Sequence, residues 1–126
     1  MPNGDAQEAL IRQVYKSARI DPKLTGFVEA HGTGTKVGDP LEATALNAVF
    51  GEGRTPRQPL LIGSVKSNIG HTEGASGVIS VIKTALMLER GFVLPNCNYE
   101  KTNEEIPMEK WNMKVGDLVQ SRWSFY

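Results

Sequence analysis

The sequence predicts an α/β protein in which a parallel or mixed sheet is packed against helices. Short apolar runs at 26–30 and 60–66 are typical of buried strands, and segments with helical spacing lie before, between and after them. The order helix, strand, helix, strand, helix indicates parallel strands joined by helical crossovers. With 126 residues, 40% of them apolar and 22% charged, the chain has the size and composition of one folded domain.

The first two helices are expected from their start and stop signals. Asp5-Ala-Gln-Glu8 has the form of a capping box, and this helix should end before Asp21-Pro22, because a residue that precedes proline is pushed out of the α region. Asp39-Pro40-Leu41-Glu42 predicts a second helix that the aspartate caps and the glutamate completes as a box. Gly51 should end it.

The third helix should run from about Thr72 to Arg90, with Gly91 as its stop and the apolar stretch 78–88 buried. After Phe92 the helical periodicity disappears, which predicts an extended segment lying along the surface. Residues 115–126 should add a short strand, and the aromatic side chains at its end should cover part of the apolar surface; these are Trp123, Phe125 and Tyr126.

Charge and composition exclude several classes of function. Lys plus Arg and Asp plus Glu both number 14, and no basic run stands out, so nucleic acid is not the expected partner. No stretch approaches the roughly 20 apolar residues of a membrane span, and residues 1–10 lack the pattern of a secretory signal. With one cysteine and no zinc-type spacing of Cys and His, the chain is expected to be soluble and cytoplasmic, and to bind no metal.

Two histidines follow the two predicted strands. His31 lies in EAHGTGT and His71 in SVKSNIGHTEGASG, each beside glycines at a turn that leads into a helix. A single histidine in such a place is more often structural, but two in equivalent places favour a shared site. One imidazole could donate a hydrogen bond to an oxyanion while the other handles a proton. A metal site is the weaker interpretation, because no third ligand is evident.

Other polar residues of the two turns have both a structural and a functional interpretation. Lys66 and Glu73, which flank His71, could form a surface ion pair or could orient the imidazole. Thr33 and Thr35 could be turn hydroxyls or could hold the amides of an extended ligand. The GTG stretch lacks the spacing of a nucleotide-binding loop. Cys97, in Pro-Asn-Cys-Asn, is not expected to be a nucleophile.

These motifs together resemble the β-ketoacyl synthase (ketosynthase) domains of polyketide and fatty-acid synthases. VEAHGTGTKVGDPLEATAL is similar to the first histidine motif of that family, and SVKSNIGHTEGASG to the second. LPNCNYEKTN further resembles the ketosynthases of fungal highly reducing polyketide synthases. The resemblance covers residues 3–115 and implies part of a thiolase-like fold, with residues 116–126 as a divergent C-terminal tail.

The resemblance also implies roles for the site residues. In the family, an acyl chain is held on a cysteine while a malonyl group on a carrier protein loses CO2 and the resulting enolate attacks the thioester. His31 and His71 would assist decarboxylation and stabilise the enolate oxygen, and Lys66 would support the second histidine, with Asn68 and Glu73 close by. Thr33 and Thr35 would contact the phosphopantetheine arm of the carrier protein, and no other cofactor is implied.

The cysteine motif of the family, of the type TACSS, does not occur in this sequence. The expected function is therefore that of a truncated ketosynthase-like protein with non-covalent acid–base chemistry on a polyketide, acyl or malonyl thioester: decarboxylation, isomerisation or conjugate addition. The alternative is a non-catalytic assembly module that binds a carrier protein, an intact polyketide synthase or itself. Apolar surface left uncovered by a partial fold leads us to expect a homo-oligomer.

Overall fold

A computed structural model describes residues 3–116 and 120–121 of the chain. Its core is a three-stranded parallel sheet in the order β1-β2-β4, formed by Phe27–Glu29, Leu60–Gly63 and Met113–Val115. Two short strands, β3 (Phe92–Val93) and β5 (Gln120–Ser121), pair antiparallel in a second sheet. The predicted α/β class is confirmed, and the sheets together are mixed in direction.

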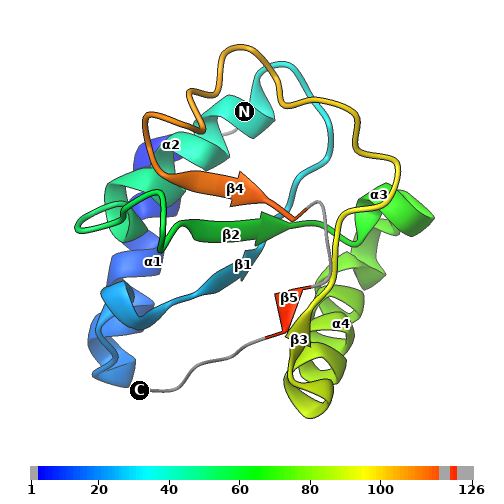
Figure 1. Cartoon of the computed structure of the whole chain (residues 1–126), viewed down its shortest axis with the longest axis horizontal. Helices are drawn as coiled ribbons and strands as arrows, with labels where there is room; N and C mark the ends of the chain where they lie inside the picture. The colour runs from blue at the N-terminus through cyan, green and yellow to red at the C-terminus, as the bar shows by residue number, and fades with distance from the viewer. Residues whose placement is uncertain (1–2, 117–119, 122–126) are drawn as a thin grey trace.

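Three long helices surround the sheet, α1 (Gly4–Ala18), α2 (Gly38–Phe50) and α4 (Ser76–Arg90). Shorter turns of helix occur at η1 (Pro22–Leu24), α3 (Lys66–Ile69) and η2 (Glu73–Ala75). In Figure 1 the strands β1, β2 and β4 point to the right, with α1 and α2 on the left of the view and α3 and α4 on the right. The yellow-to-orange segment between β3 and β4 runs across the top without regular structure, as the sequence predicts for it.

Alternating side chains of the sheet enter two cores. One core joins α1 and α2 to the sheet face that carries Val28, Leu60 and Ile62, and its helix residues include Leu46 and Phe50. Residues one position along the strands point to the opposite face, where Phe27 and Leu61 meet Met87 of α4 and Val93. The first core is the larger, and α2 contributes five buried residues to the interior whereas α4 contributes only Met87.

Several predicted boundaries and caps differ from the structure. The first helix is capped by Asn3, which accepts a hydrogen bond from the N–H of Ala6 at 3.1 Å, so the predicted capping box of residues 5–8 is wrong. Glu8 instead pairs with Arg12, one helical turn further on, at 2.7 Å. The helix ends at Ala18, before Asp21-Pro22 as expected.

The second helix begins one residue before the expected cap. α2 starts at Gly38, so Asp39 and Glu42 lie inside the helix. The N–H of Gly38 is bound by the hydroxyl of Thr35 at 3.1 Å. Both carboxylates bind a neighbouring turn rather than their own helix, so this capping-box prediction is also wrong. Gly51 ends the helix as predicted.

The strand at 60–66 and the helix at 72–90 are shorter than predicted. β2 stops at Gly63, and Lys66 already belongs to α3; the last helix starts at Ser76 after the turn of η2. Gly91, with φ +72°, ends it in the left-handed conformation that glycine favours. Within the stretch 115–126, where a strand is expected, β4 ends at Val115 and the short strand β5 lies at Gln120–Ser121. Trp123, Phe125 and Tyr126 lie outside the described residues.

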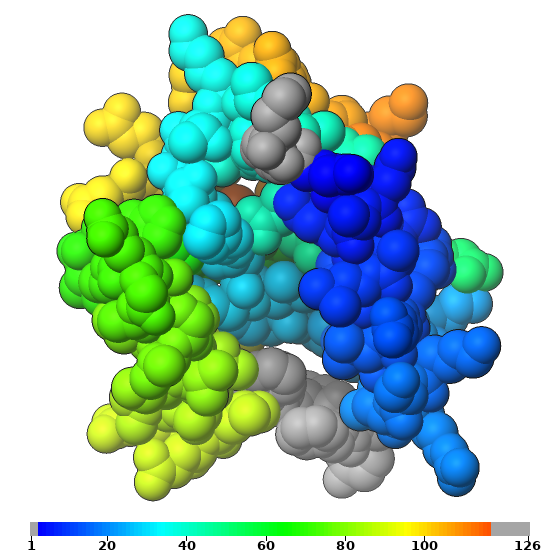
Figure 2. Space-filling model, turned by 180° about the vertical axis from the view of Figure 1, so that it is seen from behind, coloured from blue at the N-terminus to red at the C-terminus, as the bar shows by residue number. Residues whose placement is uncertain are grey.

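The prediction that residues 78–88 are buried is wrong. Met87 is buried, but large apolar residues of α4 are about half exposed or more: Val78, Val81, Ile82, Leu86 and Leu88. The apolar pattern of this helix exceeds what the small second core can cover. Figure 2 shows α4, in green to yellow-green, as a ridge that stands apart from the dark blue α1. No helix of the described residues is long and apolar enough to cross a membrane.

Candidate functional site

The two histidine turns meet because their strands are neighbours. β1 and β2 are parallel and adjacent, with Glu29 opposite Gly63, so both chains leave the sheet at the same edge. The imidazole rings of His31 and His71 lie edge to face, with centroids 5.2 Å apart and planes at 89°. Both residues are exposed. The structure thus brings the two histidines together; their catalytic role stays a prediction.

The turn that carries His31 is held by carboxylates of α2. The two oxygens of Glu42 accept the backbone N–H groups of His31 and Gly32, at 2.7 and 2.9 Å. Asp39, one turn earlier in the helix, accepts the N–H of Gly34 at 3.2 Å. Gly32 has φ +45° and Gly34 has φ +78°, and this curled backbone presents its N–H groups to the helix. The first turn of α2 therefore fixes the path of the backbone on both sides of Thr33.

The ring of His71 is oriented by a local hydrogen bond. Its Nδ1 accepts the backbone N–H of Glu73 at 3.0 Å. A neutral imidazole that accepts at Nδ1 carries its proton on Nε2, which makes Nε2 the donor. Glu73 itself has φ +47°, an uncommon conformation for a residue other than glycine. Its backbone, rather than its carboxylate, contacts the ring, and no ion pair with Lys66 occurs in the part of the chain that the structure describes.

Residues 96–98 are bonded along the junction of β2 and α3. Asn96 accepts the N–H of buried Ser64 through Oδ1 at 2.9 Å, and Asn98 donates to the carbonyl of Ser67 at 2.9 Å. Between them, the thiol of Cys97 lies 3.1 Å from the side-chain nitrogen of Asn68. These contacts give the extended segment a fixed place beside the second histidine turn. They also assign Asn68 to this junction.

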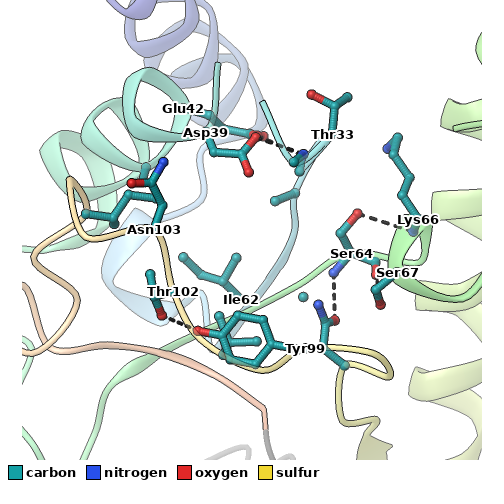
Figure 3. A pocket seen from close by; sticks show the side chains of 18 of the residues that line it. Thr33, Asp39, Glu42, Ile62, Ser64, Lys66, Ser67, Tyr99, Thr102 and Asn103 are labelled. Carbon is teal, nitrogen blue, oxygen red and sulfur yellow. Dashed lines mark hydrogen bonds between the residues drawn. The ribbon is translucent and has the colours of Figure 1, made fainter. Parts of the chain in front are cut away.

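A cavity of about 410 Å³ opens beside His71 at the carboxyl ends of the strands. Figure 3 shows its wall: Thr33, Asp39 and Glu42 on one side, Ser64, Lys66 and Ser67 on another, and Tyr99, Thr102 and Asn103 from the extended segment opposite. Its apolar lining comes from α2, the sheet and the segment before β4, and consists of Ala30, Ala43, Leu46, Ile62, Ile106, Met108 and Val115. The cavity therefore combines an apolar interior with polar groups from three segments.

The predicted site residues divide into those that line the cavity and those beside it. Thr33, Lys66 and His71 line it. His31 is not part of the lining; its ring contacts the ring of His71, which is. The remaining predicted residues are outside the lining: Thr35, whose hydroxyl accepts at the start of α2, and Asn68 and Glu73. Among the described residues, no three His, Cys, Asp or Glu side chains are grouped as ligands for a metal ion.

Sequence reasoning did not assign Asp39, Glu42 or Asn96 to the site. A carboxylate pair three residues apart, directly after a glycine-rich turn, was the available signal for the first two. Asn96 had no such signal, because its partner Ser64 is 32 residues away in sequence. Long-range hydrogen bonds of this kind become visible only when the fold is known.

Comparison with known proteins agrees with this architecture. Residues 1–100 match the family model of the β-ketoacyl synthase C-terminal domain. The chain is 62% identical over 115 residues to highly-reducing polyketide synthase 1 of Aureobasidium melanogenum, and 62% identical over 120 residues to a reducing polyketide synthase of Cochliobolus heterostrophus. These matches cover 91% and 95% of this chain, and the chain spans 5% of the length of each relative.

Solved ketosynthase structures share the fold. Ketosynthase twelve of the bacillaene polyketide synthase from Bacillus amyloliquefaciens matches with a TM-score of 0.87 at 37% identity, and the ketosynthase of module 6 from Bacillus subtilis with 0.87 at 39%. Each match covers 96% of this chain and 22% of the other. The partial thiolase-like fold is therefore confirmed, whereas the division at residues 115 and 116 stays a prediction. The chain belongs to the β-ketoacyl synthase family: residues 1–100 correspond to the C-terminal domain of a β-ketoacyl synthase, and the chain is similar to fungal highly reducing polyketide synthases.

Proposed function

We propose that this chain carries out non-covalent acid–base chemistry on a carrier-bound thioester, with His31 and His71 as the catalytic pair. The observation that supports the proposal is the edge-to-face pairing of the two imidazole rings, with centroids 5.2 Å apart, next to a cavity of about 410 Å³. Two nitrogen donors that converge on one thioester oxygen would stabilise an enolate as an oxyanion hole does.

The simplest reaction of this kind is decarboxylation of a malonyl thioester. The bond between the α-carbon and the carboxylate breaks, CO2 leaves, and the electron pair moves to the thioester oxygen as an enolate. His71 donates from Nε2 to that oxygen, in keeping with the acceptor role of its Nδ1. The α-carbon then takes a proton and the product is an acetyl thioester. Isomerisation or conjugate addition on a polyketide would pass through the same stabilised enolate.

Lys66 and Thr33 supply the polar surroundings. The ammonium of Lys66, in the cavity wall, adds positive charge near the developing enolate. Thr33 lies in the wall with a half-buried side chain, where its hydroxyl would meet an amide of the phosphopantetheine arm. Thr35 is left with a donor role, because its oxygen already accepts the N–H of Gly38.

We propose non-covalent chemistry because the single cysteine of the chain does not line the cavity. Cys97 is exposed, contacts Asn68 and is not part of the cavity lining. Both histidines are exposed as well, so water reaches the site and the electrostatic stabilisation is weaker than in a closed one. We expect a rate increase of about 10²-fold, the lower end for acid–base catalysis.

The test is incubation of the chain with a malonyl-carrier thioester, with mass spectrometry of the acetyl-carrier product. His31→Ala and His71→Ala should each bring the rate to that of the uncatalysed reaction, in variants whose thermal unfolding matches the parent chain. A parent chain that is folded and still gives only the uncatalysed rate would overturn the proposal, as would a full rate in both variants.

A second candidate function, self-association, has its own observation. The exposed apolar residues of α4 recur at Val78, Val81, Ala85 and Leu88, a spacing of three and four that is typical of a helix-to-helix seam. The stripe carries no charge, so two copies would pair without electrostatic repulsion. β1 is also an edge strand, because it pairs with β2 alone among the described strands. The partner we propose is a second copy of this chain, packed α4 against α4.

Analytical ultracentrifugation tests this second proposal. The parent chain should sediment as a dimer at micromolar concentration, and Val81→Glu should shift it to monomer by placing two like charges in the seam. Leu24→Glu is the matched control, since Leu24 is 80% exposed and lies in η1, away from α4. A monomeric parent chain, or equal dissociation by both variants, would contradict the proposed interface.

A further inference from the structure

A buried ion pair lies beneath the two histidine turns. Oε2 of Glu29 is 2.6 Å from the Nζ of Lys83, and the two side chains are only 6% and 10% exposed. The same ammonium is 5.6 Å from the centre of the ring of Phe27. Other ion pairs of the described residues are far more exposed; in Lys23–Glu52, for example, the side chains are 53% and 79% exposed. A buried pair costs desolvation energy, so it calls for an explanation beyond stability.

The carboxylate of Glu29 connects three segments that define the site. Glu29 is the last residue of β1, two positions before His31. Its Oε1 accepts the N–H of Val65 at 2.5 Å, at the start of α3 and directly before Lys66. Through Lys83 it holds α4, the helix that follows the turn of His71. One side chain thus fixes the end of β1 relative to the turn after β2 and to the helix beyond it.

We propose that Glu29 is a positioning residue that sets the spacing of the His31 and His71 rings, with Lys83 as its partner. The proposal rests on the proposed function for its chemical meaning, because ring spacing matters to catalysis only if the rings act together. Its geometric content stands apart from turnover. α4 has only a small core of its own, made with Phe27, Leu61 and Val93, so the ion pair is a main restraint on where α4, and the turn leading into it, lie.

The test uses the fact that the chain has two histidines, which gives two sets of imidazole signals in NMR spectra. A cross-relaxation peak between the rings reports their separation. Glu29→Leu combined with Lys83→Met removes the ion pair and the acceptor for Val65, and it leaves no unpaired charge in the interior. Glu29→Gln is the milder variant, in which an amide oxygen still accepts from Val65 but the charge is lost. Glu52→Gln, which breaks the exposed pair with Lys23, is the control.

We expect the double variant to stay folded. A site that loses its supporting contacts typically loosens by about 1 Å. Because the intensity of the cross-relaxation peak varies with the inverse sixth power of the separation, the inter-ring peak should fall about threefold. Glu29→Gln should weaken the peak less, and Glu52→Gln should leave it unchanged. If the double variant does not fold, a weaker peak in Glu29→Gln alone carries the proposal. A folded variant with the peak of the parent chain overturns it.

Turnover separates this proposal from the proposed function. For decarboxylation of the malonyl thioester, a displacement of about 1 Å should remove most of the expected rate increase of about 10²-fold. If the parent chain does not turn over but the peak weakens, the proposed function fails and the positioning role stands. If the parent chain turns over and neither kcat nor the peak changes in the variants, the positioning role alone fails.

Discussion

Glu42 gives the most direct way to perturb the turn that carries His31. Its carboxylate is the acceptor for two consecutive backbone N–H groups, those of His31 and Gly32, and it makes this contact from the neighbouring helix, 10 and 11 residues away. Glu42→Gln retains one acceptor oxygen and turns an N–H2 group toward the other backbone N–H. Glu42→Ala removes both acceptors. The two substitutions therefore form a series with one and two lost hydrogen bonds.

The magnitude follows from the kind of bond that is lost. A hydrogen bond to a charged group contributes about 1.5–3 kcal/mol, and the lower end applies because Glu42 is only partly buried. Glu42→Gln should then cost about 1.5 kcal/mol and Glu42→Ala about 3 kcal/mol of local stability. In local opening equilibria these values correspond to roughly tenfold and hundredfold changes, since about 1.4 kcal/mol is a factor of ten.

Amide hydrogen exchange measures this opening residue by residue. The amide protons of His31 and Gly32 should exchange about tenfold faster in Glu42→Gln and about a hundredfold faster in Glu42→Ala. Amides in the middle of α1 serve as the internal control and should keep their rates. If the two amides exchange in Glu42→Ala as they do in the parent chain, the carboxylate does not hold the turn and this reasoning is refuted.

Three further substitutions test other contacts of the site. Gly32→Ala should destabilise the fold by about 1–3 kcal/mol in urea unfolding, because a Cβ on this left-handed residue would lie 2.9 Å from the Cβ of Ser64. Gly74→Ala is the control and should be nearly neutral, since a Cβ there would meet nothing within 4 Å. Equal effects of the two substitutions would argue against a steric cause. Asn96→Ala should lower the free energy of unfolding by about 1–3 kcal/mol in the same assay, since it leaves the buried N–H of Ser64 without its acceptor. An unchanged unfolding midpoint would show that the contact is dispensable. Cys97→Ser should keep the full rate of malonyl decarboxylation, and loss of that rate would mean that the thiol takes part.

The helices and strands could be predicted well because their signals, apolar spacing and terminal glycines, lie within one short stretch of sequence. The spacing of apolar residues gave all three long helices, and Gly51 and Gly91 gave two of their ends. The carboxyl ends of the two strands placed both histidines at one edge of the sheet, since neighbouring parallel strands share that edge. The sequence alone therefore identified the two residues whose rings meet.

The errors come from side chains whose partners are distant in sequence. Asp39 and Glu42 match a capping box, but the N–H groups of the glycine-rich turn offered these carboxylates other partners. Lys83 interrupts an apolar run, and its meaning depends on Glu29, 54 residues earlier. The periodicity of α4 predicted an apolar face correctly but could not say what covers it, and Val81 is 69% exposed. Each of these features requires the three-dimensional contacts.

The measurement that tests the central claim most directly is a double-mutant cycle on His31 and His71, with the rate of malonyl-carrier decarboxylation as readout. If the rings act on one oxygen as a unit, each single alanine substitution should remove nearly all of the catalysed rate, and the double substitution should lower it little further. Losses that multiply independently, or a single variant that retains the parent rate, would contradict a shared site.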